Sequence, residues 1–265
     1  MNTKKSQPGD IGKLKLYLKQ LLEQPIKTIE AKTYWKRWRT KSNPVLLQCA
    51  DGKKYVVKGK QAGRQIINDQ IVARLGLAIE APVGNPKIIN ISQELIDIEP
   101  ELQDFGAGTA HGTEFIPNCI DEWTLIATSE PKNRIRLATL ALLYGWTHAN
   151  DRQFIFRQTP PRIIYSVDHG HFFPNPPEWR IADLEQDTFA VLDSEFENCN
   201  FTDDELKIVY DILNEVTDST IVQVVAFPRE DWGITFAERW AMINYLIERK
   251  GELQHHLKFR LGLVN

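Results

Sequence analysis

The chain has 265 residues, of which 42% are hydrophobic and 25% are charged, and its formal net charge at neutral pH is −3. A chain of this length buries a substantial core, either as one large domain or as two lobes. The nearly balanced charge gives no overall attraction to nucleic acid or to an anionic membrane surface, so we expect neither as a direct partner.

The cysteine content and the N-terminal stretch bear on the compartment. Cys49, Cys119 and Cys199 are widely spaced, and they fit neither a zinc pattern nor a disulfide framework, which favours a reducing compartment. Residues 1–9 are polar and lack the apolar core of a signal peptide. No segment approaches the roughly 20 apolar residues of a membrane span. We therefore expect a cytoplasmic protein.

The first sixty residues predict one helix and then strands. Leucine and isoleucine recur on one helical face from about residue 10 to 24, and Pro25 obstructs continuation. Residues 29–58 are rich in strand formers, and Asp51-Gly52 between two such runs is a strong hairpin signal. The basic and aromatic run 34–39 fits an exposed strand with long cations over its rings, or a surface that stacks bases.

The turn at residues 40–44 is small and polar but contains no glycine. It fits an ordinary hairpin loop, and it also fits a loop that offers backbone N–H groups to a phosphate. A second helix is predicted from about residue 65 to 75, closed by Gly76. A strand is predicted near 87–91 and a shorter one at 114–117, whereas residues 92–113 show no clear pattern.

The second half of the chain is mostly helical in pattern. A helix from about residue 132 has almost no polar face and should be buried on most sides. Residues 163–168 form a β-branched strand, and residues 174–200 have an irregular composition. Capping boxes at Thr202–Glu205 and Thr235–Glu238 open two further helices. We predict an α+β fold with a β-rich N-terminal part, a mainly helical C-terminal part and a join near residues 117–121.

Two aspartates mark the candidate site. Asp151 follows the buried helix, and Asp168 ends a strand just before a glycine-containing turn. Each alone has an ordinary explanation, as a helix cap or as a turn residue. Together they are suited to one cleft, where one carboxylate accepts a proton from a hydroxyl and the other holds a hard cation. A proton acceptor and a metal-binding carboxylate are the minimum that phosphoryl transfer requires.

Two earlier residues complete the constellation. Lys58 at a strand end supplies the fixed positive charge that nucleotide phosphates need, and Asp69 on the next helix is placed to orient it. His148, His169 and His171 cluster around the two aspartates and allow a metal-site hypothesis. A turn does not hold two imidazoles in fixed ligand geometry without support, so we expect supporting hydrogen bonds instead.

From about residue 43 to 257 the ordered set of motifs resembles the HipA-like kinases, a bacterial branch of the protein-kinase-like fold. The matching pieces are residues 44–47, Asp51-Gly52, residues 55–58, Asn68-Asp69, residues 73–77 with Pro82, Asn150-Asp151-Arg152 and residues 167–170. The resemblance implies a bilobal fold, with residues 1–118 as the β-rich lobe and 119–265 as the helical lobe.

The resemblance also implies the cofactors ATP and Mg²⁺ and a role for each site residue. Lys58 would contact ATP phosphates, and Asp69 stands where the family usually has Glu. Asp151 would be the catalytic residue and Asp168 the main metal ligand. The adenine would lie against backbone groups of Glu114, Phe115 and Ile116.

One position departs from the family pattern. The family has Asn five positions after the catalytic Asp, as a second metal ligand, and this chain has Phe156 there. Gln153 and Asn150 are the candidates to compensate, and we take Gln153 as the second metal residue. The leading hypothesis is a Ser/Thr protein kinase. The alternatives are a small-molecule kinase and a weak or inactive pseudokinase that binds nucleotide or a protein partner. The expected partners are a protein or small-molecule phosphoacceptor and a possible regulatory protein.

Overall fold

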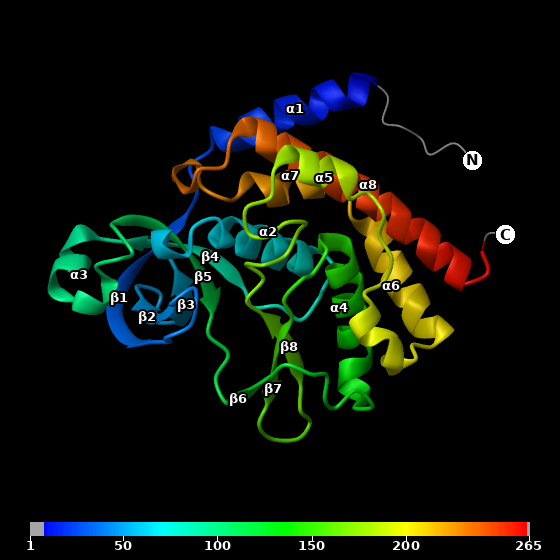
Figure 1. Ribbon diagram of the computed structural model, residues 1–265, viewed down its shortest axis with the longest axis horizontal. Coiled ribbons are helices and arrows are strands. Elements are labelled where there is room, and N and C mark those ends of the chain that lie inside the picture. The colour runs from blue at the N-terminus through cyan, green and yellow to red at the C-terminus, as the bar shows by residue number, and fades with distance from the viewer. Residues whose placement is uncertain (1–7, 264–265) are drawn as a thin grey trace.

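Strands dominate the first half of the chain and helices the second half in the computed structural model, which describes residues 8–263 (Figure 1). This agrees with the predicted α+β class. None of the helices in the described part of the chain is both long enough and apolar enough to cross a membrane.

The strand-rich part is a closed barrel. Its strands follow one another around the wall in the order β1 (Thr28–Arg37), β2 (Val45–Cys49), β3 (Lys54–Lys58), β5 (Gly108–Glu114) and β4 (Pro86–Ile91). Neighbouring strands are antiparallel except β1 and β4, which are parallel and close the barrel. Closure leaves no unpaired edge within the barrel. Apolar side chains fill its interior, and helix α3 (Gln93–Ile98) and η2 (Pro100–Leu102) contribute to the same cluster.

Local signals in the barrel behave as expected. The predicted hairpin joins β2 to β3, with Gly52 at a φ of +79° and the N–H of Lys53 donating to Oδ1 of Asp51 at 3.1 Å. The basic and aromatic run lies on β1, where Nζ of Lys54 stands 3.1 Å from the ring centre of Trp35. This is the arrangement expected of an exposed strand surface with long cations.

Helix α2 (Gln65–Ala78) packs with the helical part of the molecule. Its apolar side chains share one large core with α4 (Arg134–Thr147), α7 (Asp218–Ala226) and α8 (Phe236–Arg260). The prediction that Gly76 ends this helix is wrong, because α2 continues to Ala78. Gly76 is needed for packing instead, since a Cβ there would lie 2.9 Å from a methyl group of Val83.

A second sheet supports the candidate site. It consists of β6 (Cys119–Glu122), β7 (Gln153–Arg157) and β8 (Ile164–Val167), all antiparallel. Phe154 of β7 stacks on Tyr144 of α4, with ring centres 5.8 Å apart. Helix α4 therefore covers one face of this sheet.

The remaining elements surround this frame. Helix α1 (Pro8–Leu22) contacts α7 and begins two residues before the predicted start, and Figure 1 shows it at the outer side of the helical part. Capping boxes at Thr202 and Thr235 open α6 (Asp203–Glu215) and α8 as predicted. The other short elements are η1 (Lys60–Ala62), η3 (Pro131–Asn133), α5 (Ile181–Gln186), η4 (Ser194–Cys199) and η5 (Glu230–Trp232).

Five helices and strands were not predicted, among them α5 in the segment 174–200 that was expected to be irregular, and one strand was misplaced. Helices α3 and α7 and strands β6 and β7 had no assignment from the sequence. The strand expected at 114–117 is β5, which ends at Glu114 and begins at Gly108. Its centre holds a buried histidine, His111, next to Gly112, so it lacks the apolar alternation of an ordinary strand. Gly112 is required because a Cβ there would lie 2.5 Å from Ile89.

Candidate functional site

A cluster of charged side chains forms where the end of β3, helix α2 and the turn after β8 come together. Lys58, the last residue of β3, is 5% exposed. Its Nζ donates to Oδ2 of Asp69 at 2.9 Å and to Oδ1 of Asp168 at 2.5 Å. The structure thus brings together three residues that are up to 110 positions apart in the sequence.

Asp69 links the lysine to the turn that follows β8. Its other oxygen, Oδ1, accepts a hydrogen bond of 2.7 Å from the backbone N–H of His169. Burial tends to raise the pKa of Asp69, but the charge and hydrogen bond of Lys58 together with the neighbouring His111 and His169 outweigh burial and hold this pKa below its usual range. Burial opposes the charged form of Lys58 as well, and the two carboxylates nevertheless hold its pKa above the ordinary value. Both groups are therefore ionised at neutral pH.

Asp168 has an uncommon backbone conformation. Its φ is +58°, in the left-handed region, and its side chain is 36% exposed. Strained backbone of this kind persists where surrounding contacts hold it, and it concentrates at functional sites. Here the contacts are the Lys58 ion pair and the anchored His169 that follows. One edge of the Asp168 carboxylate is consequently held while the group remains accessible.

His169 is a buried anchor for that turn. Its Nε2 lies 2.8 Å from Oγ of Ser166, which lies 2.5 Å from the hydroxyl of Tyr144. Burial lowers the pKa of His169 to about 4, so the ring is neutral at neutral pH. His148 directly follows the last residue of α4, and its Nδ1 lies 2.7 Å from Oδ2 of Asp187. No group of three His, Cys, Asp or Glu side chains suited to a metal occurs within residues 8–263. His148 and His169 thus form hydrogen bonds, as expected from the sequence, whereas the His171 side chain makes none with residues 8–263.

Strand register places Asp151 beside the Asp168 turn. Gln153 pairs with Val167 across β7 and β8, and Ala149 forms a bridge with Phe172. The segment with Asp151 therefore runs antiparallel to the one with Asp168, and the two aspartates share one edge of the sheet.

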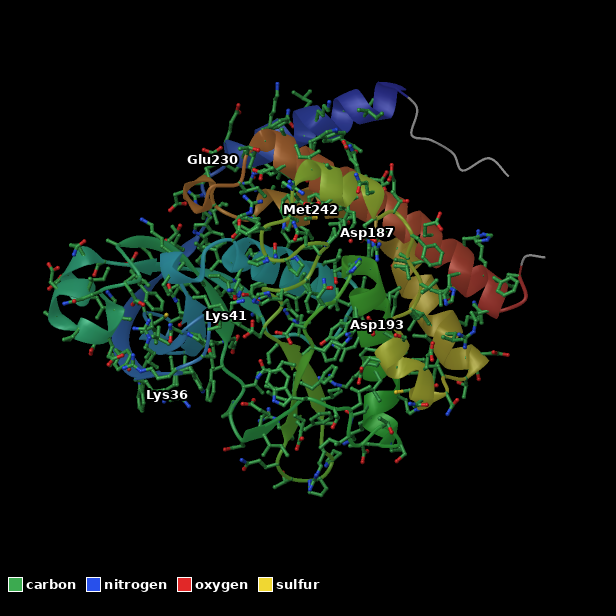
Figure 2. All side chains as sticks on the ribbon, in the orientation of Figure 1. Lys36, Lys41, Asp187, Asp193, Glu230 and Met242 are labelled. Atoms are coloured by element: carbon green, nitrogen blue, oxygen red, sulfur yellow. The ribbon has the colours of Figure 1, made fainter. Side chains whose placement is uncertain are left out.

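The loop around Asp151 is anchored by its neighbours. Nδ2 of Asn150 donates to the carbonyl oxygens of His148 at 3.0 Å and Phe173 at 2.9 Å. Nη2 of Arg152 donates to Oδ2 of Asp193 at 2.7 Å, and Figure 2 shows Asp193 beside α4. The carboxylate of Asp151 is exposed and makes no hydrogen bond or ion pair with the described residues. Its position is held while its oxygens stay free.

Phe156 and Gln153 point to opposite faces of β7. Phe156 is fully buried in the large core together with Phe154 and does not face the site. Gln153 is the first residue of β7, and its side chain lies on the other face, half-buried, with Val167 as its strand partner. Of the two candidate substitutes for the missing Asn, Asn150 is tied to the backbone, and Gln153 makes no side-chain hydrogen bond with residues 8–263.

Two of the three backbone N–H groups predicted to hold an adenine already make hydrogen bonds within the chain. The N–H of Glu114 donates to the carbonyl oxygen of Asn85 at 3.0 Å, and the N–H of Phe115 donates to that of Lys54 at 2.8 Å. The Glu114 carboxylate binds Nζ of Lys53 at 2.8 Å. Within the described chain, the N–H of Ile116 makes no hydrogen bond. Ile116 is therefore the free donor of the three predicted residues.

The loop between β1 and β2 lies next to the segment that follows Lys58. Nε2 of Gln61 donates to the carbonyl oxygens of Ser42 at 3.3 Å and Asn43 at 3.5 Å. Figure 2 shows Lys41 of this loop on the side of the barrel that faces the rest of the molecule.

A row of hydrogen-bonded polar side chains behind the site was not predicted from the sequence. Nε2 of His111 lies 2.9 Å from Oγ1 of Thr113, and its Nδ1 lies 2.8 Å from the side-chain amide of Gln70. Burial lowers the pKa of His111 to about 4. The neutral ring accepts from the Gln70 nitrogen, and the Gln70 oxygen accepts from Nη2 of Arg74 at 2.9 Å. The only sequence signal was a histidine in a strand without apolar alternation.

Comparisons with known proteins identify a family and a structure with a similar fold. Residues 32–173, more than half of the chain, match the family model described as HipA-like kinase. A solved structure of the Helicobacter pylori proinflammatory kinase CtkA is similar with a TM-score of 0.58 and 10% identity, covering 91% of this chain and 97% of that one. The Golgi casein kinase with Mn/ADP bound has a TM-score of 0.48 and 12% identity, covering 97% of this chain and 78% of that one. No curated protein matches the sequence.

Proposed function

This chain belongs to the HipA-like kinase family, and we propose that it is an ATP- and magnesium-dependent phosphotransferase acting on a Ser or Thr of a protein. The observation that carries the proposal is the contact of Lys58 with both Asp69 and Asp168, beside an anchored loop that leaves Asp151 free. A fixed cation, a metal-binding carboxylate and a proton acceptor are the parts that phosphoryl transfer requires.

The nucleotide is proposed to bind with its phosphates at Lys58. Because the pKa of this lysine is held above its usual value, the ammonium is charged at neutral pH. Asp69 fixes its orientation through the 2.9 Å contact. The free N–H of Ile116 and the carbonyl groups of Glu114 and Phe115 would hold the adenine edge. The loop 40–44 would cover the phosphates with backbone N–H groups.

The donor set fits magnesium. Mg²⁺ prefers oxygen ligands and usually binds through one or two carboxylates together with substrate phosphates, so it does not need a complete protein cage. Asp168 supplies a partly exposed carboxylate, and Gln153, the strand partner of the preceding residue Val167, supplies an amide oxygen. When bound there, the metal would neutralise part of the negative charge of the phosphates.

Asp151 is proposed as the residue that orients the acceptor hydroxyl and accepts its proton. An exposed carboxylate with free oxygens at a fixed position is suited to this role. Asn150 and Arg152 supply the positional restraint through their bonds to the backbone and to Asp193.

The larger organisation is proposed to follow the family. We divide the chain at residue 118 into a nucleotide-binding barrel lobe and a helical lobe with Asp151 and Asp168. The acceptor is a protein, with a small molecule as the alternative, and a regulatory protein partner is expected. The proposed location is the cytoplasm.

A specific observation favours a second candidate, a pseudokinase. Phe156 occupies the family's second metal position and is fully buried in the core. No change of rotamer at Phe156 supplies a metal ligand at that position, because its side chain carries none. If Gln153 does not replace it, the fold would bind nucleotide or a protein partner without efficient catalysis.

The decisive experiment is transfer of label from ATP in the presence of magnesium and a cell lysate. We expect labelled protein with the natural chain and a loss of about 10²–10⁴-fold for Asp151→Asn, the range for removal of a general base. Asp97→Asn is the matched control, because Asp97 is exposed on α3. Equal labelling by Asp151→Asn would refute the role of Asp151.

Thermal shift separates the alternatives. Stabilisation by ATP that requires magnesium supports the kinase, whereas a metal-independent shift without labelling supports the pseudokinase. Label that appears in small molecules and not in protein supports the small-molecule kinase. Absence of any shift contradicts nucleotide binding.

A further inference from the structure

A large cavity lies on the side of the barrel that faces α1 and α7, outside the cluster of Lys58, Asp69 and Asp168. Its volume is about 1070 Å³, and Lys58, Asp151 and Asp168 are not among its lining residues. The end of α1, the start of β1, the β2–β3 turn, the start of β4 and the end of α7 enclose it. This volume is slightly above the usual range for small-molecule pockets, roughly 300–1,000 Å³.

The lining carries more positive than negative side chains. Four are basic and two are acidic, and they are Lys27, Lys53, Arg74, Lys87, Glu30 and Asp51. Both acids are hydrogen-bonded to neutral donors and keep their negative charge, because Glu30 accepts from Asn90 at 2.9 Å and Asp51 accepts from the hydroxyl of Tyr55 at 2.6 Å.

Three of the four cations remain without a counter-charge. Lys53 is paired with Glu114 at 2.8 Å. None of the ion pairs within residues 8–263 involves Lys27, Arg74 or Lys87. With Lys53 paired to Glu114, three cations and two carboxylates line the cavity, so its net charge is positive.

Strand register sets two of these cations next to each other. Thr28 pairs with Ile88 in the parallel contact of β1 and β4, so Lys27 and Lys87 each precede one member of that pair. Adjacent like charges on paired strands repel each other. An anion between the two ammonium groups would remove this repulsion.

Arg74 is held in position from two sides. Its guanidinium lies 3.2 Å from the ring centre of Phe227, and its Nη2 donates to the Gln70 oxygen at 2.9 Å. Burial lowers the pKa of Arg74 to about 10, and no carboxylate counteracts this. Because the side chain is already ordered, little conformational entropy is lost when its other N–H groups bind a ligand.

Apolar groups line the rest of the cavity. They come from α1 and its following loop, from the barrel and from α7, and they include Leu21, Ile26, Ile29, Ile88, Ala226 and Phe227. A ligand that only neutralised charge would leave this surface in water.

We propose that this cavity binds a small amphiphilic anion, with its acidic group between Lys27 and Lys87 and its apolar body against Ile29, Ile88 and Phe227. Arg74 offers a second contact for an anionic group. The site contains none of Lys58, Asp151 and Asp168, and the proposal does not depend on phosphotransfer.

The test compares two fluorescent probes that differ in charge. One is 1-anilinonaphthalene-8-sulfonate, and the other is N-phenyl-1-naphthylamine, which has the same ring system without the sulfonate. We expect saturable one-to-one binding of the sulfonate, at least fivefold tighter than that of the neutral probe. Lys27→Glu and Lys87→Glu should each abolish this preference.

Lys36→Glu is the matched control. It makes the same charge change on the barrel, at a lysine that lies over Trp38 and does not line the cavity. The preference should survive this change. Equal affinity for both probes, survival of the preference in Lys27→Glu and Lys87→Glu, or equal loss in the control would each overturn the proposal. Circular dichroism melting of all variants verifies folding, since Lys27 and Lys36 are exposed.

Discussion

At the scale of single residues, the ion cluster of Lys58, Asp69 and Asp168 dominates. Lys58 and Asp69 are nearly fully buried, and each has lost most of its hydration. A buried ion pair contributes little net stability, but removal of one partner leaves an uncompensated buried charge. The cluster is therefore better explained by its role in fixing the positions of these charged groups than by a contribution to stability.

We predict that Lys58→Met lowers the free energy of unfolding by about 3–5 kcal/mol, because Asp69 stays buried without its cation. Urea unfolding measures this. The double variant Lys58→Met/Asp69→Asn should recover part of the loss, since the buried charge is removed. Lys60→Met, at an exposed lysine two positions later, should change stability by less than about 0.5 kcal/mol. A similar small effect for Lys58→Met would contradict the buried-charge argument.

His111 predicts a pH dependence of stability. Its pKa is lowered by burial from 6.5 to about 4, so between these values the unfolded chain binds a proton that the folded chain does not. Stabilisation is thus complete above pH 6.5 and is lost as pH falls toward 4. From pH 7 to pH 5 the loss from this group is about 2 kcal/mol. Urea unfolding of His111→Gln at both pH values should show a correspondingly smaller decrease than the natural chain, and equal decreases would disprove the assignment.

At the scale of elements, α4 illustrates how close packing overrides helix propensity. Gly145 lies within α4, where a Cβ would stand 1.9 Å from the carbonyl oxygen of Val191. The segment after α5 therefore packs directly on the helix backbone, and the N–H of Asp193 donates to the carbonyl oxygen of Ala141 at 3.0 Å. Because Asp193 also binds Arg152, this contact helps to position the loop with Asp151.

Gly145→Ala should destabilise the protein by about 1–3 kcal/mol, the cost of overpacking a well-packed site. The matched control is Gly251→Ala in α8, where no atom lies within 4 Å of the added Cβ. In that helix the same change should stabilise by about 0.5–1 kcal/mol through helix propensity. Thermal unfolding of both variants measures the two signs. Stabilisation by both substitutions would show that the Val191 segment yields easily.

At the scale of the whole molecule, the barrel and the helical part are joined by more than the chain connection after β5. Nε1 of Trp232 donates to the carbonyl oxygen of Thr109 at 3.1 Å and lies 3.0 Å from its Oγ1. Asp231 accepts from the Thr109 hydroxyl at 2.8 Å, and Arg64 pairs with Glu238 at 3.0 Å. These contacts tie the start of β5 and of α2 to η5 and α8.

Trp232→Phe removes the donor and keeps most of the ring. We expect a loss of about 1 kcal/mol in the free energy of unfolding, together with faster amide hydrogen exchange at the start of β5. Trp123→Phe is the control, because Trp123 is 67% exposed and should change stability by less than about 0.5 kcal/mol. Unchanged exchange at β5 would show that Trp232 does not restrain the barrel.

The sequence alone determined the features that depend on neighbours in the chain. The capping boxes at Thr202 and Thr235, the Asp51-Gly52 hairpin and the buried helix before Asp151 all rest on contacts within a few residues, so their patterns were sufficient. The positions of Lys58, Asp151 and Asp168 at element ends could be predicted for the same reason.

The tertiary structure decided whatever depends on contacts between distant segments. Only packing shows that Gly76 lies inside a helix and that the β5 strand contains His111 and Gly112, because Val83 and Ile89 take the space of the missing Cβ atoms. Register across β7 and β8 directs Phe156 into the core and Gln153 to the opposite face, and a shift of one residue would exchange them. The meeting of Lys58 with Asp168 likewise depends on many long-range contacts at once, which local patterns do not encode.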